Sequence, residues 1–289
     1  MTIGFIGFGE AAYCISSGLQ AQGVTDILAY DSMEHHPTMG NLIAQRAKET
    51  GVTLCGLEAV AKADVLFGAV PSSYALEVAK SVLPYLRKGQ IYADVSASTP
   101  KVKQQIWALV KDTGILFADA AMLGSLPQDK HRVPITASGN GASAFQEAMT
   151  PYGMRITYVQ GEAGAASAIK LMRSVFMKGL ASLMVEMLQG ADAYAVTGDV
   201  VASIAKSMDG IAFTQHLDRL VTGTAIHAVR RSAELKGSIE MLTECGLDSS
   251  MAKASKEKHD LLAAFDFQKR YINGKPAGAQ EIITSLGVK

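Results

Sequence analysis

The chain opens with a glycine-rich turn between a short apolar run, residues 2–7, and a helical stretch. The turn reads Gly7-Phe8-Gly9-Glu10-Ala11-Ala12, with the spacing G-x-G-x-x-A. Gly7 permits a tight strand-to-helix turn, Gly9 lets the backbone approach a pyrophosphate, and Ala12 keeps helix and strand close. A strand before the motif and a helix after it are the context that the motif requires. The pattern predicts an α/β sheet that binds a dinucleotide through these six residues.

An acidic residue stands where a bound ribose would need it. Residues 26–31 are typical of a second strand, and Asp31 ends it, about 20 positions after the glycines. A carboxylate there accepts hydrogen bonds from ribose hydroxyls and repels a 2′-phosphate, and no arginine follows directly. Asp31 could instead start a turn or cap the next helix. We favour the ribose role, and therefore expect NAD as the cofactor, with NADP possible.

Strands and helices keep alternating as far as residue 160. Further strands are expected at 52–54, 64–70, 90–96, 116–123, 133–137 and 155–159. This alternation predicts a doubly wound parallel sheet, in which ligands bind beyond the carboxyl ends of the strands. We therefore expect Val70, Pro71 and Ser96 to contact the cofactor. Ordinary turn chemistry is the alternative for each of these residues.

After Gln160 helical patterns replace the strands. Helices are expected at 165–193, 199–208, 214–220, 225–245 and 249–265, with Gly198, Gly210, Gly223 and Gly246 as breaks. The sequence thus predicts a Rossmann-like dinucleotide-binding domain of residues 1–160. An all-α C-terminal domain of residues 161–289 would follow, beginning with a long interdomain helix. We expect this apolar helix also to pack against a partner subunit.

The long helix carries basic residues beside an apolar stripe. Helical spacing places Lys170, Arg173 and Ser174 on one face. The stripe, which we expect to be buried, consists of Ile169, Met172, Phe176 and Leu180. The methionines Met172, Met177, Met184 and Met187 are expected in the core. A solvated basic face is the ordinary interpretation of Lys170, and a site is the alternative.

Composition excludes several classes of function. Lys and Arg number 27 and balance 27 Asp and Glu, so the chain has no general attraction for nucleic acid. No apolar run is long enough to span a bilayer, and the start of the chain lacks a basic leader. Three scattered cysteines favour a reducing compartment and argue against a metal site. We expect a cytoplasmic protein without metal, membrane or nucleic-acid partners.

A second charged cluster lies near the C-terminus. His227, Arg231 and Glu234 share one helical face. The cluster could form a ladder of surface ion pairs, or it could bind an anion at a cleft. The sequence does not discriminate between these two interpretations.

Together these motifs resemble the β-hydroxyacid dehydrogenase family, relatives of 3-hydroxyisobutyrate and 6-phosphogluconate dehydrogenases. The segments that carry the resemblance are Gly4–Ala12, Asp119–Ser125 and Gly161–Lys170. Their order and spacing agree over nearly the whole chain. The resemblance places Lys170 on the family's catalytic lysine, and Met122, Leu123 and Gly124 in its substrate loop.

Several positions depart from the family pattern. The substrate-loop proline is Ala121, and the serine that would hold a substrate carboxylate is Leu123. Arg173 and Ser174 stand where the family has two asparagines, or a histidine and an asparagine. The chain is most similar to a divergent branch with a C-terminal domain of unassigned function. The departures argue against a standard small 3-hydroxy acid as the substrate.

The resemblance implies an NAD(P)-dependent oxidoreductase that acts on the CH–OH group of an anionic hydroxy acid or a sugar-acid-like substrate. Lys170 would be the general acid/base with Ser174 beside it, and Arg173, His227 and Arg231 would bind the anion. Burial, Arg173 and an oxidised nicotinamide would lower the pKa of Lys170. The alternatives are an NADPH-dependent keto or imine reductase on the same fold, and a non-catalytic dinucleotide sensor. We also expect a homodimer or higher homo-oligomer through the C-terminal helices.

Overall fold

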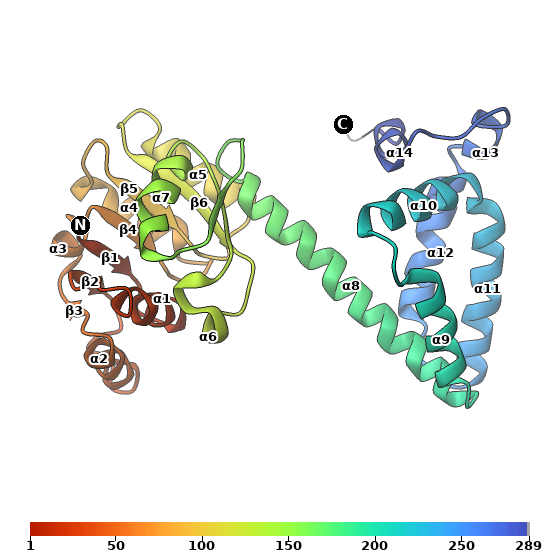
Figure 1. Ribbon diagram of the computed structural model, residues 1–289, viewed down its shortest axis with the longest axis horizontal. Helices are drawn as coiled ribbons and strands as arrows, with labels where there is room; N and C mark the ends of the chain where they lie inside the picture. The colour runs from red at the N-terminus through yellow and green to blue at the C-terminus, as the bar shows by residue number, and fades with distance from the viewer. Residues whose placement is uncertain (288–289) are drawn as a thin grey trace. The chain divides into compact units, whose positions relative to one another are not determined.

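Residues 1–287 are described by a computed structural model, and their strands all lie in the first part of the chain (Figure 1). The chain divides into two units, Met1–Val175 and Phe176–Lys289. The division falls inside α8 (Ala165–Ala193), whereas the sequence places the boundary just before this helix. The last two residues of the expected 161–289 domain, Val288 and Lys289, lie outside the described residues.

The first unit is built on one eight-stranded sheet, with the strand order β3-β2-β1-β4-β5-β6-β7-β8. The strands are β1 (Ile3–Ile6), β2 (Ile27–Tyr30), β3 (Thr53–Leu54), β4 (Val65–Gly68), β5 (Ile91–Asp94), β6 (Leu116–Met122), β7 (Ile135–Ser138) and β8 (Ile156–Tyr158). The order reverses at β1, where the chain crosses from β3 to β4. The predicted Rossmann-like, doubly wound architecture is therefore confirmed.

One strand departs from the fully parallel sheet that the sequence predicts. β7 runs antiparallel to β6, with Asp119 opposite Ser138, while β8 is again parallel to β7. The connection from β6 to β7 holds only α6 (Leu126–Asp129) and the 3₁₀ turn η2 (Lys130–Arg132). A parallel crossover usually contains a full helix, whereas this connection holds only a four-residue helix and a 3₁₀ turn, so the chain returns antiparallel.

Helices cover both faces of the sheet, because the buried strands are apolar on both sides. In β4, Val65 and Phe67 face one apolar cluster and Leu66 faces the other. The first cluster includes residues of α1 (Glu10–Gln20), α2 (Met39–Glu49) and α7 (Ala142–Met149). The second includes residues of α3 (Leu57–Val60), α4 (Ala75–Val82) and α5 (Pro100–Val110). The 3₁₀ turns η1 (Leu83–Tyr85) and η3 (Thr150–Tyr152) end α4 and α7.

A glycine inside α1 makes room for a histidine. A Cβ atom on Gly18 would lie 2.0 Å from Nδ1 of His131, which belongs to η2. The His131 side chain is buried, and its ring nitrogens have no hydrogen-bond partner among the described residues. Burial is the main cause that lowers the pKa of His131, and Arg132 and Lys130 lower it further. A neutral imidazole therefore fills the space between α1 and η2.

The second unit is helical throughout its described part. It continues α8 and adds α9 (Thr197–Met208), α10 (Phe213–Ile226), α11 (Ala228–Glu244), α12 (Ser250–Ala263), α13 (Phe267–Arg270) and α14 (Ala279–Ser285). The buried Glu186 of α8 accepts hydrogen bonds from the backbone N–H groups of Met251 and Ala252, each at 2.8 Å, and so caps α12. Gly198 and Gly223, expected as breaks, lie inside α9 and α10.

The apolar stripe of α8 is exposed in this chain, contrary to expectation. Ile169, Met172 and Phe176 are 40%, 65% and 47% exposed, and Leu180 is half-buried. Met177 and Met184 are exposed as well, so the helix's methionines do not form the predicted core. In residues 1–287, no helix combines the length and the apolar character needed to cross a membrane.

Candidate functional site

A pocket of about 640 Å³ lies at the carboxyl ends of the first strands, around the turn from β1 to α1. Gly7 has φ +85°, and a Cβ there would lie 2.5 Å from the carbonyl oxygen of Ala69, so the turn requires glycine. Gly9 caps α1 without a side-chain hydrogen bond, and a Cβ added to it would meet no atom within 4 Å. The first N–H groups of a helix have no intrahelical partner. The turn therefore fits a pyrophosphate.

Asp31 borders this pocket and is held in place by backbone N–H groups. Its Oδ2 accepts a hydrogen bond from Phe8 N at 2.7 Å, and its Oδ1 accepts one from Met33 N at 2.8 Å. Each carboxylate oxygen retains a free lone pair for a ribose hydroxyl. Arg46, from α2, borders the same pocket. Arg46 is not predicted from the sequence, because it does not follow Asp31 directly and belongs to the next helix.

A second pocket, of about 290 Å³, adjoins the first and contains Lys170 in its wall. The two pockets share Gly9, Ala69, Val70 and Pro71. The other residues of the second pocket for which the sequence predicts a role are Glu10, Ala11, Ser96 and Met122. Ala12 is fully buried beneath the turn. The structure thus brings the predicted lysine together with most of the predicted cofactor residues.

The half-buried amine of Lys170 has a lowered pKa, as a general base requires. Burial is the main cause, the nearby Lys103 lowers the pKa further, and Asp119 raises it. The direction agrees with the sequence-based expectation. The neighbouring cation is Lys103, however, and not Arg173.

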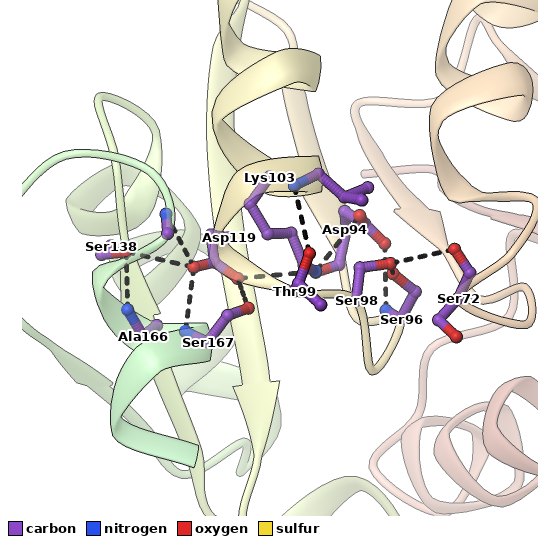
Figure 2. Close-up of polar contacts among 12 residues, drawn as sticks. Ser72, Asp94, Ser96, Ser98, Thr99, Lys103, Asp119, Ser138, Ala166 and Ser167 are labelled. Atoms are coloured by element: carbon purple, nitrogen blue, oxygen red, sulfur yellow. Dashed lines mark hydrogen bonds and ion pairs between the residues drawn. The ribbon is translucent and has the colours of Figure 1, made fainter. Parts of the chain in front are cut away.

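The N-terminus of α8 is fastened to the sheet through Asp119 of β6 (Figure 2). Asp119 Oδ2 accepts hydrogen bonds from the N–H groups of Gly164 and Ser167, both at 3.0 Å. Asp119 Oδ1 accepts one from Ser167 Oγ at 2.7 Å. Ser138 Oγ donates to Asp119 at 3.4 Å and accepts from Ala166 N at 3.0 Å. Lys170, one turn beyond Ser167, is therefore positioned by the sheet.

A buried lysine forms an ion pair with Asp119. Lys103 of α5 is fully buried, and its Nζ donates to the carbonyl oxygen of Asp94 at 2.7 Å. The same Nζ lies 3.1 Å from Asp94 Oδ2 and 3.4 Å from Asp119 Oδ1 (Figure 2). Asp94 Oδ1 accepts a hydrogen bond from Ser96 N at 2.9 Å. Because Ser96 borders the second pocket, this hydrogen bond connects the ion pairs of Lys103 with the pocket wall.

Besides the buried Ala12, four predicted residues of the first unit do not border either pocket within the described part of the chain. Leu123 is half-buried and its N–H donates to the carbonyl of Pro134 at 2.7 Å, while Gly124 is exposed. On α8, Arg173 is exposed and Ser174 is half-buried. Their roles in substrate binding and catalysis stay predictions.

His227 and Arg231 belong to the second unit. His227 is exposed at the start of α11, and Arg231 Nη1 donates to Thr224 Oγ1 at 2.8 Å. Glu234 forms an ion pair with Arg230 rather than with either of them. The anion-binding role of His227 and Arg231 stays a prediction. Within residues 1–287, no three His, Cys, Asp or Glu side chains are grouped so that they could hold a metal ion.

Comparison with known protein families divides the chain in two. Residues 2–98 match the family described as NADP oxidoreductase, coenzyme F420-dependent. Residues 191–262 match a domain of unknown function, DUF1932.

Individual proteins match almost the whole chain. The conserved protein MTH1747, described as of unknown function and structurally similar to 3-hydroxyacid dehydrogenases, is 30% identical, with 93% of this chain and 99% of that chain covered and a TM-score of 0.65. An uncharacterized 28.5 kDa protein of Methanothermus fervidus is 27% identical over 258 residues, 89% of this chain and 96% of that protein. An imine reductase of Aspergillus terreus in complex with NADPH4 is 16% identical, with 98% of each chain covered and a TM-score of 0.73, which shows a shared fold.

The fold, the glycine turn and these matches define a protein with the NAD(P)-binding oxidoreductase fold, in the 3-hydroxyacid dehydrogenase-like class. Within it, the chain belongs to the β-hydroxyacid dehydrogenase family, in a divergent branch whose C-terminal domain has no assigned function.

Proposed function

We propose that this protein is a dehydrogenase that acts on the CH–OH group of an anionic hydroxy acid or a sugar-acid-like substrate, with Lys170 as the general acid/base. The observation that carries the proposal is the position of Lys170. Its half-buried amine, with a lowered pKa, borders the pocket next to the glycine turn. A lysine serves as a base near neutral pH only when its pKa is lowered in this way.

The cofactor would be held by groups of the first unit. The helix N-terminus at Gly9 would hold the pyrophosphate, and the Asp31 carboxylate would accept from the ribose hydroxyls, which favours NAD. When bound, a nicotinamide dinucleotide supplies the acceptor or donor of hydride. In oxidation the free amine of Lys170 takes the hydroxyl proton of the substrate, and in reduction the ammonium returns it.

An anionic substrate requires cationic groups that bind its negative charge. We propose Arg173 for this role, with Met122 at the pocket wall and Ser174 near the reacting group, and we propose His227 and Arg231 of the second unit as anion-binding residues. Met122 borders the same pocket as Lys170, which supports its part in the proposal. The apolar Leu123, where the family has a serine, favours a carboxylate bound by these cations rather than by the β6–β7 loop.

The decisive experiment measures nicotinamide reduction by the purified protein. Hydroxy acids, sugar acids and their phosphates are tested with NAD and NADP in parallel. Lys170→Met should lose turnover by about 10²–10⁴-fold, because the general acid/base is gone, and should still bind the dinucleotide. Lys178→Met, on the exposed surface of the same helix, is the matched control and should retain turnover.

The possible outcomes separate the proposal from its alternatives. Turnover that survives in Lys170→Met contradicts the general acid/base role. Reduction of ketones or imines with NADPH, without oxidation of any hydroxy acid, favours a keto or imine reductase. Tight dinucleotide binding without turnover across the panel favours a sensor.

A further inference from the structure

Lys103 is a buried charge that packing alone does not explain. It lies on the buried face of α5 with Ile106 and Val110, where an apolar side chain would fill the same space. Removing an ammonium from water is costly, and apolar residues often replace buried ion pairs without loss of stability. The lysine therefore calls for an explanation in terms of its charge.

The contacts of Lys103 explain what the charge does. Its Nζ lies within 3.4 Å of carboxylate oxygens of both Asp94 and Asp119. Asp119 also accepts from two N–H groups and from two hydroxyls, those of Ser138 and Ser167. All four groups donate hydrogen bonds to the Asp119 carboxylate. Lys103 is the cation that balances it.

The charge of Asp119 must be balanced because its carboxylate lies close enough to the Lys170 amine to raise the pKa of that amine. Asp119 binds Ser167, and Lys170 follows Ser167 by one helical turn on the same face of α8. A carboxylate without a counter-ion at this place would favour the ammonium form of the nearest lysine. The cluster thus contains two lysines and two aspartates, and only one of the lysines borders the pocket.

We propose that Lys103 is a positioning residue that neutralises Asp119 and thereby keeps the Lys170 amine free to accept a proton. The part that Lys103 plays in catalysis rests on the proposed function, in which Lys170 is the general acid/base. The expected effect of Lys103 on the protonation of the Lys170 amine does not depend on which substrate the protein binds.

The charges around Lys170 agree with this role. Lys103 lowers the pKa of Lys170 and Asp119 raises it, after the larger effect of burial. Other charged groups of the surrounding elements include Asp94 of β5, Glu10 of α1, which borders the same pocket, Arg173 of α8 itself and the exposed Lys101 of α5. Lys103 is the cation among them that is fully buried beside Asp119.

The test measures the free amine of Lys170 directly. Trace labelling with acetic anhydride, which reacts with unprotonated amines, is followed from pH 6 to 10 by peptide mass spectrometry. In Lys103→Met, Lys170 should be labelled about tenfold more slowly at pH 8 than in the unsubstituted protein. Lys101→Met removes an exposed charge from the same helix and should leave the labelling of Lys170 unchanged. An unchanged rate in folded Lys103→Met would overturn the proposal.

Two double variants keep the test decisive if Lys103→Met does not fold. Lys103→Met/Asp94→Asn and Lys103→Met/Asp119→Asn have the same net charge and differ in which carboxylate remains. The first retains Asp119 behind Lys170 and should show slow labelling, while the second should show fast labelling. Equal rates would overturn the proposal, because it requires that Asp119 without its counter-ion slows the labelling of Lys170 and that Asp94 does not.

These readouts also separate this proposal from the proposed function. If Lys170→Met retains turnover, the general acid/base assignment fails, while the labelling comparison still reports on Lys103. If turnover depends on Lys170 but labelling is insensitive to Lys103, only the role of Lys103 fails. When both hold, the pH profile of turnover in Lys103→Met should move to higher pH.

Discussion

At the residue scale, the proposed preference for NAD depends on the Asp31 carboxylate. Its oxygens bind Phe8 N and Met33 N at 2.7 and 2.8 Å and have lone pairs left for a ribose. Asp31→Ser should raise the KM for NAD by about tenfold or more, because hydrogen bonds to a charged acceptor are lost. The KM for NADP should change less, because the repulsion of its 2′-phosphate is lost as well.

Arg46 provides the control for this prediction, since it borders the same pocket. Arg46→Met should leave the KM for NAD near its original value and should weaken any binding of NADP. Steady-state kinetics with both cofactors measures these effects. An equal loss for NAD and NADP in Asp31→Ser would show that Asp31 only supports the turn at Phe8.

The pH dependence of turnover follows from the state of Lys170. Burial and Lys103 lower the pKa of this amine, so its free form is present at lower pH than for an exposed lysine. Oxidation needs the free amine and should rise as pH increases through this lowered pKa, whereas reduction needs the ammonium and should fall over the same range. Profiles of kcat/KM measured in both directions test the opposite slopes. Two profiles with the same slope would contradict the role of Lys170.

The sequence identified the glycine turn, Asp31 and Lys170, because each belongs to a motif with fixed spacing. It missed Lys103, since one lysine on a helix resembles a solvated residue. A signal was present, because Lys103, Ile106 and Val110 have the spacing of one buried helix face. That Lys103 pairs with Asp94 and Asp119 depends on the pairing of β5 with β6, which local spacing does not reveal.

At the element scale, the sequence predicts the bounds of a helix correctly where the helical pattern is long. The range expected for the long helix, 165–193, agrees with α8. Gly223 was interpreted as a break but lies inside α10, where the helix continues to Ile226 against the Arg231 side chain. The direction of β7 was also missed, because a short strand has the same side-chain pattern in either direction. Tertiary contacts, rather than the local sequence, determine whether a glycine ends a helix and in which direction a short strand runs.

The contact between α1 and η2 predicts an unusual effect of a helix-favouring substitution. Alanine stabilises a helix by about 1 kcal/mol relative to glycine. At Gly18, however, the added Cβ would lie 2.0 Å from the His131 ring, so Gly18→Ala should destabilise the protein by about 1–3 kcal/mol. Thermal or urea unfolding measures this change in the free energy of unfolding.

Gly237→Ala is the matched control, because it lies inside α11 with no atom within 4 Å of the added Cβ. This variant should be neutral or stabilising. In Gly18→Ala/His131→Ala the cost of the added methyl group should disappear, which gives strong non-additivity. Additive effects at Gly18 and His131 would show that the two side chains do not compete for space.

At the scale of the whole molecule, the exposed apolar residues of α8 support assembly with a second copy. Leu183, Met184, Val185 and Leu188 are 43%, 49%, 57% and 40% exposed. Contiguous apolar surface of this kind marks protein interfaces. Val185→Glu should convert an oligomer into a smaller species in light scattering, because a charge would be buried at the interface. Gln189→Glu, at an exposed polar position of the same helix, should not. A monomeric unsubstituted protein would contradict the predicted homo-oligomer.

The Gly18–His131 contact also has an evolutionary consequence. The two positions are far apart in sequence, yet one side chain occupies the volume that the other gives up. Among related chains, positions 18 and 131 should therefore co-vary. A relative with a side chain at position 18 should have a smaller residue at position 131, and glycine should persist wherever the histidine does. Because η2 lies between β6 and β7, the residues at these two positions would show how each lineage packs α1 against the β6–β7 connection.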